Sequence, residues 1–157
     1  MKSIQSKENR IHVSNEKPFS FYECIIPDLF PYVPMHWHEE LPVIYVLEGM
    51  VRVQTLEENV LLHAGEGIFI NKNVVHLVEK IEECCYKSFL FPDYFVSFYM
   101  GSPAAKLTAA LTANPQIAVV FLGNETWHTA ILEHLQKLIS LEESKMAENR
   151  DDFYCYE

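Results

Sequence analysis

Two apolar segments, each closed by a turn and lying about thirty residues apart, constrain the fold of this chain most. The first runs from His36-Trp37-His38 through the apolar stretch 42–47 to Glu48-Gly49, and the second from Gly65-Glu66-Gly67 through 68–70 to His76. Each is typical of a strand or strand pair closed by a turn. Side chains two positions apart on a strand share a face. The pattern therefore predicts that His36, His38 and His76 meet on neighbouring strands of a small β-barrel.

The rest of the region between Phe19 and Phe91 repeats the same kind of signal. Short runs rich in Val, Ile, Tyr and Phe alternate with turns every eight to twelve residues, and three prolines break the chain before the first histidine pair. Seven or eight such strands indicate a β-sandwich or barrel. We expect a further strand near residues 11–14.

Helical patterns follow after Pro92. Residues 103–113 are rich in alanine and leucine and predict a short helix, and the apolar segment 117–122 predicts an edge strand or a buried extended chain. Gly123-Asn124 marks a break with an N-cap candidate. Beyond it, apolar side chains from Trp127 to Ile139 recur at helical spacing and predict an amphipathic helix of about four turns. The segment 146–157 ends without a cap or turn signal, which leads to the hypothesis that the sequence stops inside a helix of a longer protein.

Composition narrows the classes of function. The 157 residues suit one domain, and the net charge is -10, with only three arginines and no basic cluster. The charge therefore argues against nucleic acid and anionic membranes as partners for this chain alone, because both need a concentrated basic surface. An N-terminal signal and a membrane-spanning run are absent from the sequence, so we expect a cytoplasmic protein. Its four cysteines lack metal-site spacing and are expected to be reduced thiols.

The three histidines admit two interpretations. Three neutral imidazoles can bind zinc, iron, nickel or copper. The spacing resembles the two motifs of the cupin superfamily, but Pro42 stands where the metal-binding glutamate is expected, and Asn71 and Asn73 replace a proline and a glycine. The only anionic ligand is therefore missing. We expect that the chain holds no cofactor and that the three histidines shape the mouth of the barrel. The alternative is a metal held by the same three residues.

The phrases His36–Gly49 and Gly65–His76, in this order and spacing, resemble the first half of AraC-type transcription regulators. The amphipathic helix resembles the family's linking helices. The resemblance implies a mainly β fold: a cupin-like double-stranded β-helix, or jelly-roll, barrel over residues 1–122, followed by a helical dimerisation and linker segment over 123–157. It also implies a small-molecule effector, a homodimer, and DNA binding only through a helix-turn-helix half that is missing here.

Two sets of residues carry these expectations. The candidates for the ligand pocket are the histidines and nearby aromatic side chains on the expected strands, which suit a sugar or an aromatic metabolite: His36, His38, His76, Tyr22, Tyr45, Phe69, Tyr86 and Phe89. The candidates for a dimer helix are Ile131, Leu135, Leu138 and Ile139, although the same stripe would also suit packing on the barrel.

Two other functions remain open at this stage. One is a small metal-dependent cupin enzyme, a dioxygenase or an isomerase, that uses His36, His38 and His76. The other is a cupin that binds a sugar or metabolite without a DNA-binding half.

Overall fold

The computed structural model describes residues 6–7, 18–114 and 118–148, and within them the mainly β fold is confirmed. The ten strands are β1 (Ser6–Lys7), β2 (Ser20–Ile25), β3 (Tyr32–Trp37), β4 (Leu41–Glu48), β5 (Met50–Thr55), β6 (Asn59–His63), β7 (Gly67–Ile70), β8 (His76–Lys80), β9 (Cys85–Phe91) and β10 (Ala118–Phe121). The three helices are α1 (Asp93–Ser97), α2 (Pro103–Ala113) and α3 (Thr126–Glu148). The expected strand near residues 11–14 and most of the expected segment 146–157 lie outside the described residues.

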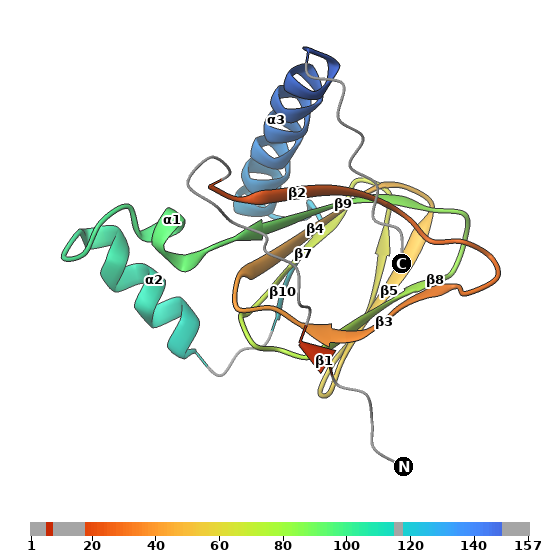
Figure 1. The fold of residues 1–157 in the computed structure, drawn as a ribbon, viewed down its shortest axis with the longest axis horizontal. Helices are drawn as coiled ribbons and strands as arrows, with labels where there is room; N and C mark the ends of the chain where they lie inside the picture. The colour runs from red at the N-terminus through yellow and green to blue at the C-terminus, as the bar shows by residue number, and fades with distance from the viewer. Residues whose placement is uncertain (1–5, 8–17, 115–117, 149–157) are drawn as a thin grey trace.

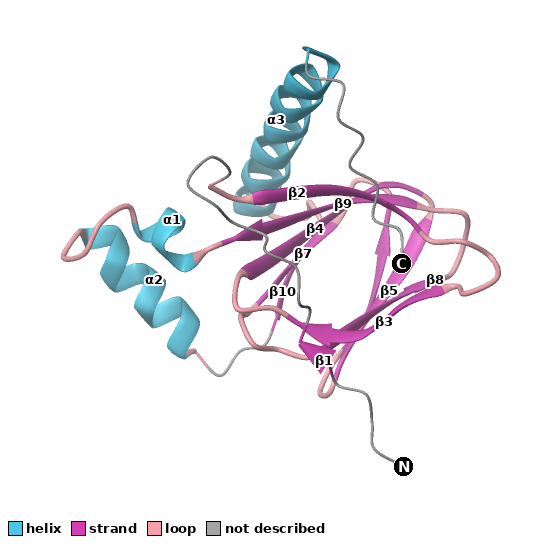
Figure 2. Cartoon of the chain, in the orientation of Figure 1, coloured by secondary structure: helices cyan, strands magenta, loops and turns pink. Residues whose placement is uncertain are grey.

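The strands form two five-stranded sheets that face each other, as expected for a jelly-roll barrel (Figure 1). The first sheet has the order β1-β3-β8-β5-β6 and the second has the order β10-β7-β4-β9-β2. Apart from the two-residue β1, which pairs with β3 in parallel, all the pairings are antiparallel. In Figure 2 the helices lie outside the block of strands, with α1 and α2 projecting from one end.

Two separate cores share the second sheet. The inner core fills the space between the sheets and contains Ile44, Val46, Val53, Ile68 and Tyr86 among its buried members. The outer core lies on the reverse face of the second sheet, where α3 packs. Strand β4 explains this arrangement, because its residues from 41 to 46 are all buried, whichever face they point to. A strand that is covered on both faces has a continuous run of apolar residues in its sequence.

The helices differ from the sequence expectations in two places. Helix α2 spans 103–113 as predicted, but α1 was not predicted, since its five residues are too few to show a helical period. Helix α3 begins at Thr126 and runs for 23 residues, so the prediction of about four turns was too short. The apolar stripe of α3 ends near Leu141. Because the last turns of the helix are polar, no helical spacing of apolar residues indicated them in the sequence. Within the described residues, none of the helices is long and apolar enough to cross a membrane.

Lys87 links α3 to the second sheet. Its side chain is 2% exposed, and its ammonium group contacts the carboxylates of Glu23 on β2 and Glu143 on α3, the latter at 2.8 Å. Burial is the largest single influence and lowers the pKa of Lys87, but the hydrogen bonds to Glu143 and Glu23 together hold the pKa above its usual value of 10.5. The ion pair between Lys87 and Glu143 therefore fixes the C-terminal half of α3 over the sheet.

Gly49, the glycine that closes the first motif, occupies a position that admits only glycine. Its φ is +71°, and a Cβ atom there would lie 1.8 Å from the carbonyl oxygen of Glu83. We predict that Gly49→Ala lowers the free energy of unfolding by at least about 2 kcal/mol more than Gly65→Ala does, because the added methyl forces the backbone apart. Gly65 is the matched control, since its φ is +88° and nothing lies within 4 Å of the place that an added Cβ would take. Equal losses in urea unfolding would contradict the close approach.

The Lys87 contacts generate a second prediction. Replacing both Glu23 and Glu143 by glutamine leaves a buried ammonium group without a countercharge and is expected to cost about 3 kcal/mol or more. Lys87→Met is expected to cost less in urea unfolding at pH 7, because the two carboxylates are 37% and 52% exposed and regain water. The stabilisation by Lys87 is complete below its unfolded pKa and is lost as the pH rises above 10.5 through its raised folded pKa. A double variant no less stable than Lys87→Met would contradict this account.

Candidate functional site

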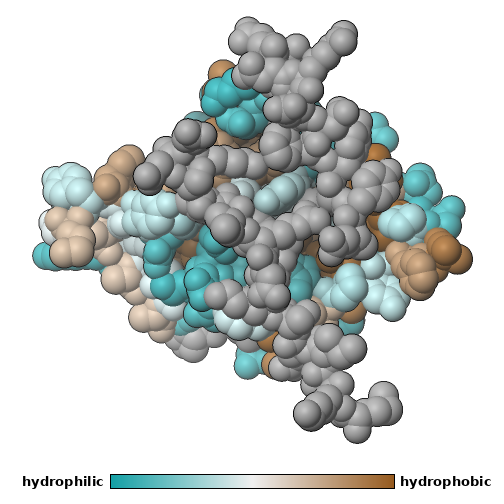
Figure 3. Space-filling model, in the orientation of Figure 1, coloured by the Kyte–Doolittle hydropathy of each residue, from teal (hydrophilic) through white to brown (hydrophobic). Residues whose placement is uncertain are grey.

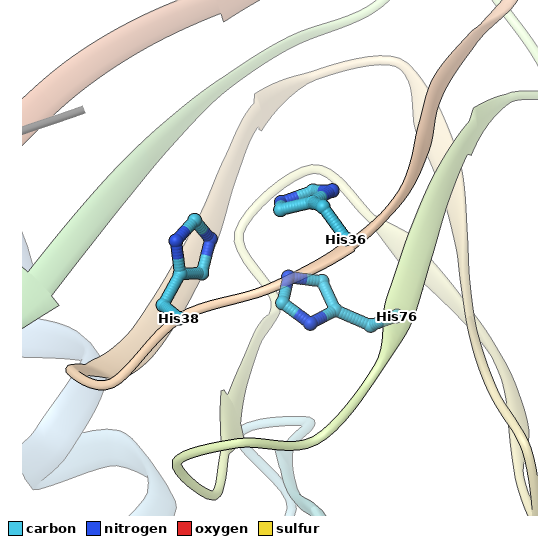
Figure 4. Close-up of side chains that lie close together, drawn as sticks. All are labelled: His36, His38 and His76. Atoms are coloured by element: carbon cyan, nitrogen blue, oxygen red, sulfur yellow. The ribbon is translucent and has the colours of Figure 1, made fainter. Parts of the chain in front are cut away.

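The structure brings His36, His38 and His76 together, as the sequence predicted (Figure 4). One ring nitrogen from each residue lies within 4.8 Å of those of the other two. The ring centroids are 4.7 Å apart for His36 and His38, 4.5 Å for His36 and His76, and 5.5 Å for His38 and His76. His38 and His76 are buried, and His36 is half-buried. Among the described residues, this is the group of possible metal ligands that the geometry identifies.

Main-chain pairing sets these positions. His36 on β3 lies directly opposite His76, the first residue of β8, and a register shift separates this pair from Val33 and Val78. His38 follows the end of β3, and its carbonyl oxygen accepts a hydrogen bond of 2.8 Å from the backbone N–H of Asn73. Asn73 has a φ of 61°, a conformation in which asparagine is several-fold enriched. The turn before β8 therefore holds the segment that follows β3.

The three histidines lie at the edge of the inner core. His76 is two residues before Val78, which belongs to that core, so both side chains point to the interior. Two of the aromatic candidates share this interior: Tyr86 is buried in the inner core, and Tyr22 packs against it. Five of the eight predicted pocket residues therefore face the inside of the barrel.

The other three pocket candidates lie on the opposite side of the second sheet from the histidines. Tyr45, Phe69 and Phe89 belong to the outer core or pack against it, on the reverse face of the second sheet. Tyr45 alternates with the inward-facing Ile44 and Val46, and its hydroxyl accepts a hydrogen bond of 2.7 Å from the Gln136 side chain on α3. The sequence could not distinguish the two faces, because β4, β7 and β9 carry apolar residues on both of them.

The dimer-helix candidates are largely committed to packing within the chain. Leu135 and Ile139 are 5% and 6% exposed in the outer core, and Ile131 and Leu138 are partly buried against it. The neighbouring side chains Trp127 and Leu141 are 47% and 59% exposed. Leu135 and Ile139 therefore fix α3 to the barrel, and Ile131 and Leu138 remain half-buried at the edge of this contact.

An apolar groove of about 1140 Å³ lies over the outer face of the second sheet, and the sequence analysis did not foresee it. Its walls come from the sheet, from α1 with the turn after it, from α2 and from α3; they include Phe69, Phe91, Phe95, Phe98, Leu111 and Trp127. The only signal in the sequence was the aromatic run 94–99 after Pro92. Figure 3 shows apolar, brown-tinted residues among hydrophilic ones at the end of the molecule that carries α1 and α2.

Comparisons with known proteins agree with this architecture. The model of the AraC-like ligand binding domain family matches residues 28–145, which include all three histidines and most of α3. A curated relative is an HTH-type transcriptional regulator, YdeC of Bacillus subtilis strain 168, which is 29% identical over 143 residues. The alignment covers 88% of this chain and 48% of that protein, so the chain spans about half the length of the relative.

Solved structures show likeness in the fold. Apo ToxT from Vibrio cholerae superposes with a TM-score of 0.55 at 10% identity, over 82% of this chain and 49% of that chain. A second structure of ToxT gives a TM-score of 0.52 at 10% identity, over 90% of this chain and 60% of that chain. The shared part is therefore 49% of one of these larger chains and 60% of the other.

Proposed function

Because the chain belongs to the family of AraC-like ligand-binding domains, we propose that it is the effector-sensing domain of a transcription regulator. The single observation that carries the proposal is the family match over 28–145, which spans the barrel, the histidine cluster and α3. A small barrel of this kind either fills its interior with side chains or holds one small ligand. Polar side chains that converge at the edge of an apolar interior fix the orientation of such a ligand.

In this proposal, contact with DNA belongs to another part of the regulator. The chain carries a net charge of -10, whereas binding to DNA requires a concentration of Lys and Arg against the phosphates. The curated relative, described as an HTH-type regulator, is about twice as long as the stretch it shares with this chain. Its role on DNA supports a cytoplasmic location for the protein that we propose.

The effector is bound without being turned over. An enzyme that uses the same histidines is the competing function, and Pro42 argues against it. This residue is buried on β4, on the same face as Ile44 and Val46, and offers no carboxylate to the histidines. A cupin enzyme with the usual four ligands would need one there. Turnover of a bound metabolite by the purified chain would favour the enzyme.

Ligand binding inside the barrel is testable by thermal unfolding against a panel of sugars and aromatic metabolites. A compound present at 100 times its Kd stabilises the folded state by about 2.7 kcal/mol. We predict that His36→Ala abolishes the increase in Tm that such a compound causes. Tyr45→Phe, on the reverse face of the sheet, should keep it.

The outcome that contradicts the proposed site is a ligand whose stabilisation survives His36→Ala and is lost in Tyr45→Phe. A ligand found in this way should also change transcription from a reporter controlled by the complete regulator. A compound that binds the barrel and leaves the reporter unchanged would contradict the regulatory role.

The regulator acts as a homodimer, with α3 contributing to the interface. Leu135 and Ile139 are buried against the barrel, so the dimer uses the half-buried Ile131 and Leu138 together with the exposed Trp127 and Leu141. These four positions are spaced by four, seven and three residues, which matches one seam of a heptad repeat. A two-fold axis beside α3 would bring equal seams together.

Sedimentation equilibrium tests this interface. Leu141→Glu places a carboxylate at a 59% exposed apolar position in the seam and is expected to raise the dimer Kd at least about tenfold, because the charge must be desolvated on association. Ala130→Glu adds the same charge at an exposed position of α3 outside the seam and should leave the Kd unchanged. A monomeric wild-type chain, or equal effects of the two substitutions, would contradict the proposed seam.

A further inference from the structure

The apolar groove over the outer face of the second sheet has the size and the lining of a pocket for a small molecule. Its volume of about 1140 Å³ is slightly above the range of about 300 to 1,000 Å³ that is usual for ligand pockets. Within the described chain, seven of the fourteen residues that line it are aromatic, and none of the fourteen is charged. Ligand pockets are lined in the same way, mainly by apolar and aromatic side chains with few polar groups.

The polar groups of the lining indicate what kind of molecule fits. Among the fourteen residues, only the hydroxyl of Tyr94 and the indole N–H of Trp127 are polar side-chain groups, and the indole N–H already donates a hydrogen bond of 2.7 Å to Glu125. A charged molecule would lose its water in the groove and gain no countercharge from the lining, which is costly. The complementary molecule is therefore neutral and largely apolar.

The aromatic side chains of the groove favour a molecule with a flat ring. Phe91 on the floor of the groove stacks on Phe89 at 5.7 Å between ring centroids, with 5° between the planes. It also stacks on Phe95 of α1 at 6.0 Å, with 13° between the planes. This column of nearly parallel rings leads from the sheet to Phe95, which is 40% exposed. Offset stacking on such a ring stabilises an aromatic ligand beyond the burial of its surface.

Polar contacts hold the wall that α1 and α2 form. The two helices stand at one end of the block of strands (Figure 1). The buried amide of Asn71 donates a hydrogen bond of 3.1 Å to the carbonyl oxygen of Leu111 in α2, and the ammonium group of Lys72 lies 2.6 Å from the carboxylate of Asp93 in α1. Both helices are thus tied to the turn that follows β7. A groove with walls fixed in advance loses less entropy when a ligand binds.

Phe98, at the mouth of the groove, is held in a strained conformation. Its φ is 63° and its ψ is -63°, and the N–H of Tyr99 donates a hydrogen bond of 2.8 Å to the carbonyl oxygen of Ser97. This is a γ-turn with a positive φ, which is rare and strained. The side chain of Phe98 lines the groove and is 80% exposed, so packing within the described chain offsets little of the strain. Strain of this kind clusters at functional positions such as ligand clamps.

We propose that this groove binds a neutral, apolar molecule that contains an aromatic ring, and that Phe98 contacts the molecule at the mouth. The site is separate from the one proposed inside the barrel, because its floor is the opposite face of the second sheet. Trp127 and Ile131 line the groove and also belong to the proposed dimer seam, so a bound molecule lies beside that interface. The groove site does not rest on the proposed function.

Photolabelling of the wild-type 157-residue chain locates the bound molecule. Benzophenone is a suitable probe, because it is neutral, carries two aromatic rings and reacts with nearby C–H bonds under near-ultraviolet light. Mass spectrometry of the digested chain should find the label in residues 91–98 and 119–135, which contribute to opposite sides of the groove. Label confined to inner-core residues such as Ile44 and Val53 would overturn the inference.

A titration with N-phenyl-1-naphthylamine, a neutral aromatic dye that fluoresces in apolar surroundings, measures the affinity. Phe98→Gly removes the ring and is expected to raise the Kd of the dye at least about tenfold. Because glycine adopts a positive φ readily, the variant should keep the Tm of the wild type or exceed it. Met100→Gly is the matched control, since Met100 is 96% exposed in the same turn and lies outside the groove lining of the described chain. An equal Kd for the two variants would overturn the inference.

Two further variants separate this site from the other proposals. Leu141→Glu, which weakens the proposed dimer, should bind the dye with the Kd of the wild type. Dye binding that appears only in Leu141→Glu would show that a second copy fills the groove, and would overturn the inference. Labelling that is lost in His36→Ala and survives in Phe98→Gly would place the probe in the barrel, with the same consequence. None of these measurements uses an effector or a reporter, so the groove site and the sensing function can fail independently.

Discussion

The burial of both faces of the second sheet is the constraint on which the rest of the structure depends. Strand β4 and its neighbours β7 and β9 pack against the first sheet on one face and against α3 on the other. Hydrophobic burial on this scale is the main favourable term in folding. A sheet with one apolar face exposed to water would lose much of this stabilisation. Helix α3 is therefore a necessary cover for the barrel, and Lys87 adds a charged contact between them.

This arrangement gives the site and the helix a shared set of strands. The inward side chains of β4 and β9, such as Ile44 and Tyr86, face the interior that the histidines border. The outward side chains of the same strands contact α3, where Tyr45 and Gln136 are hydrogen-bonded. A ligand that displaces these strands from the inside would also displace them against α3. The packing is continuous from the barrel interior through β4 and β9 to α3, as coupling between two sites requires.

The predictions from sequence succeeded where local patterns carry the information and failed where they do not. Most of the strands, helix 103–113 and the convergence of His36, His38 and His76 follow from alternation, turns and spacing. Strand β3 is an exception, because it runs through Pro34, where we expected the prolines to break the chain. The sequence did not reveal that Tyr45, Phe69 and Phe89 face away from the histidines, because a strand buried on both faces has no polar face to reveal its orientation. Helix α1 was missed, since five residues do not show a period. The family resemblance added the kind of domain, and the match over 28–145 confirmed the family.

By itself, the sequence determined the class of fold, most of its strands and the three histidines that meet in it. These properties depend on periods of two and 3.6 residues, on glycine and proline at turns, and on residue identity, all of which are local. Only the tertiary structure decided which aromatic side chains face the barrel and which face α3, that Lys87 joins the helix to the sheet, and that an apolar groove lies beside it. These features arise from contacts between residues far apart in the chain, and no local pattern encodes which of two apolar faces a neighbour will cover.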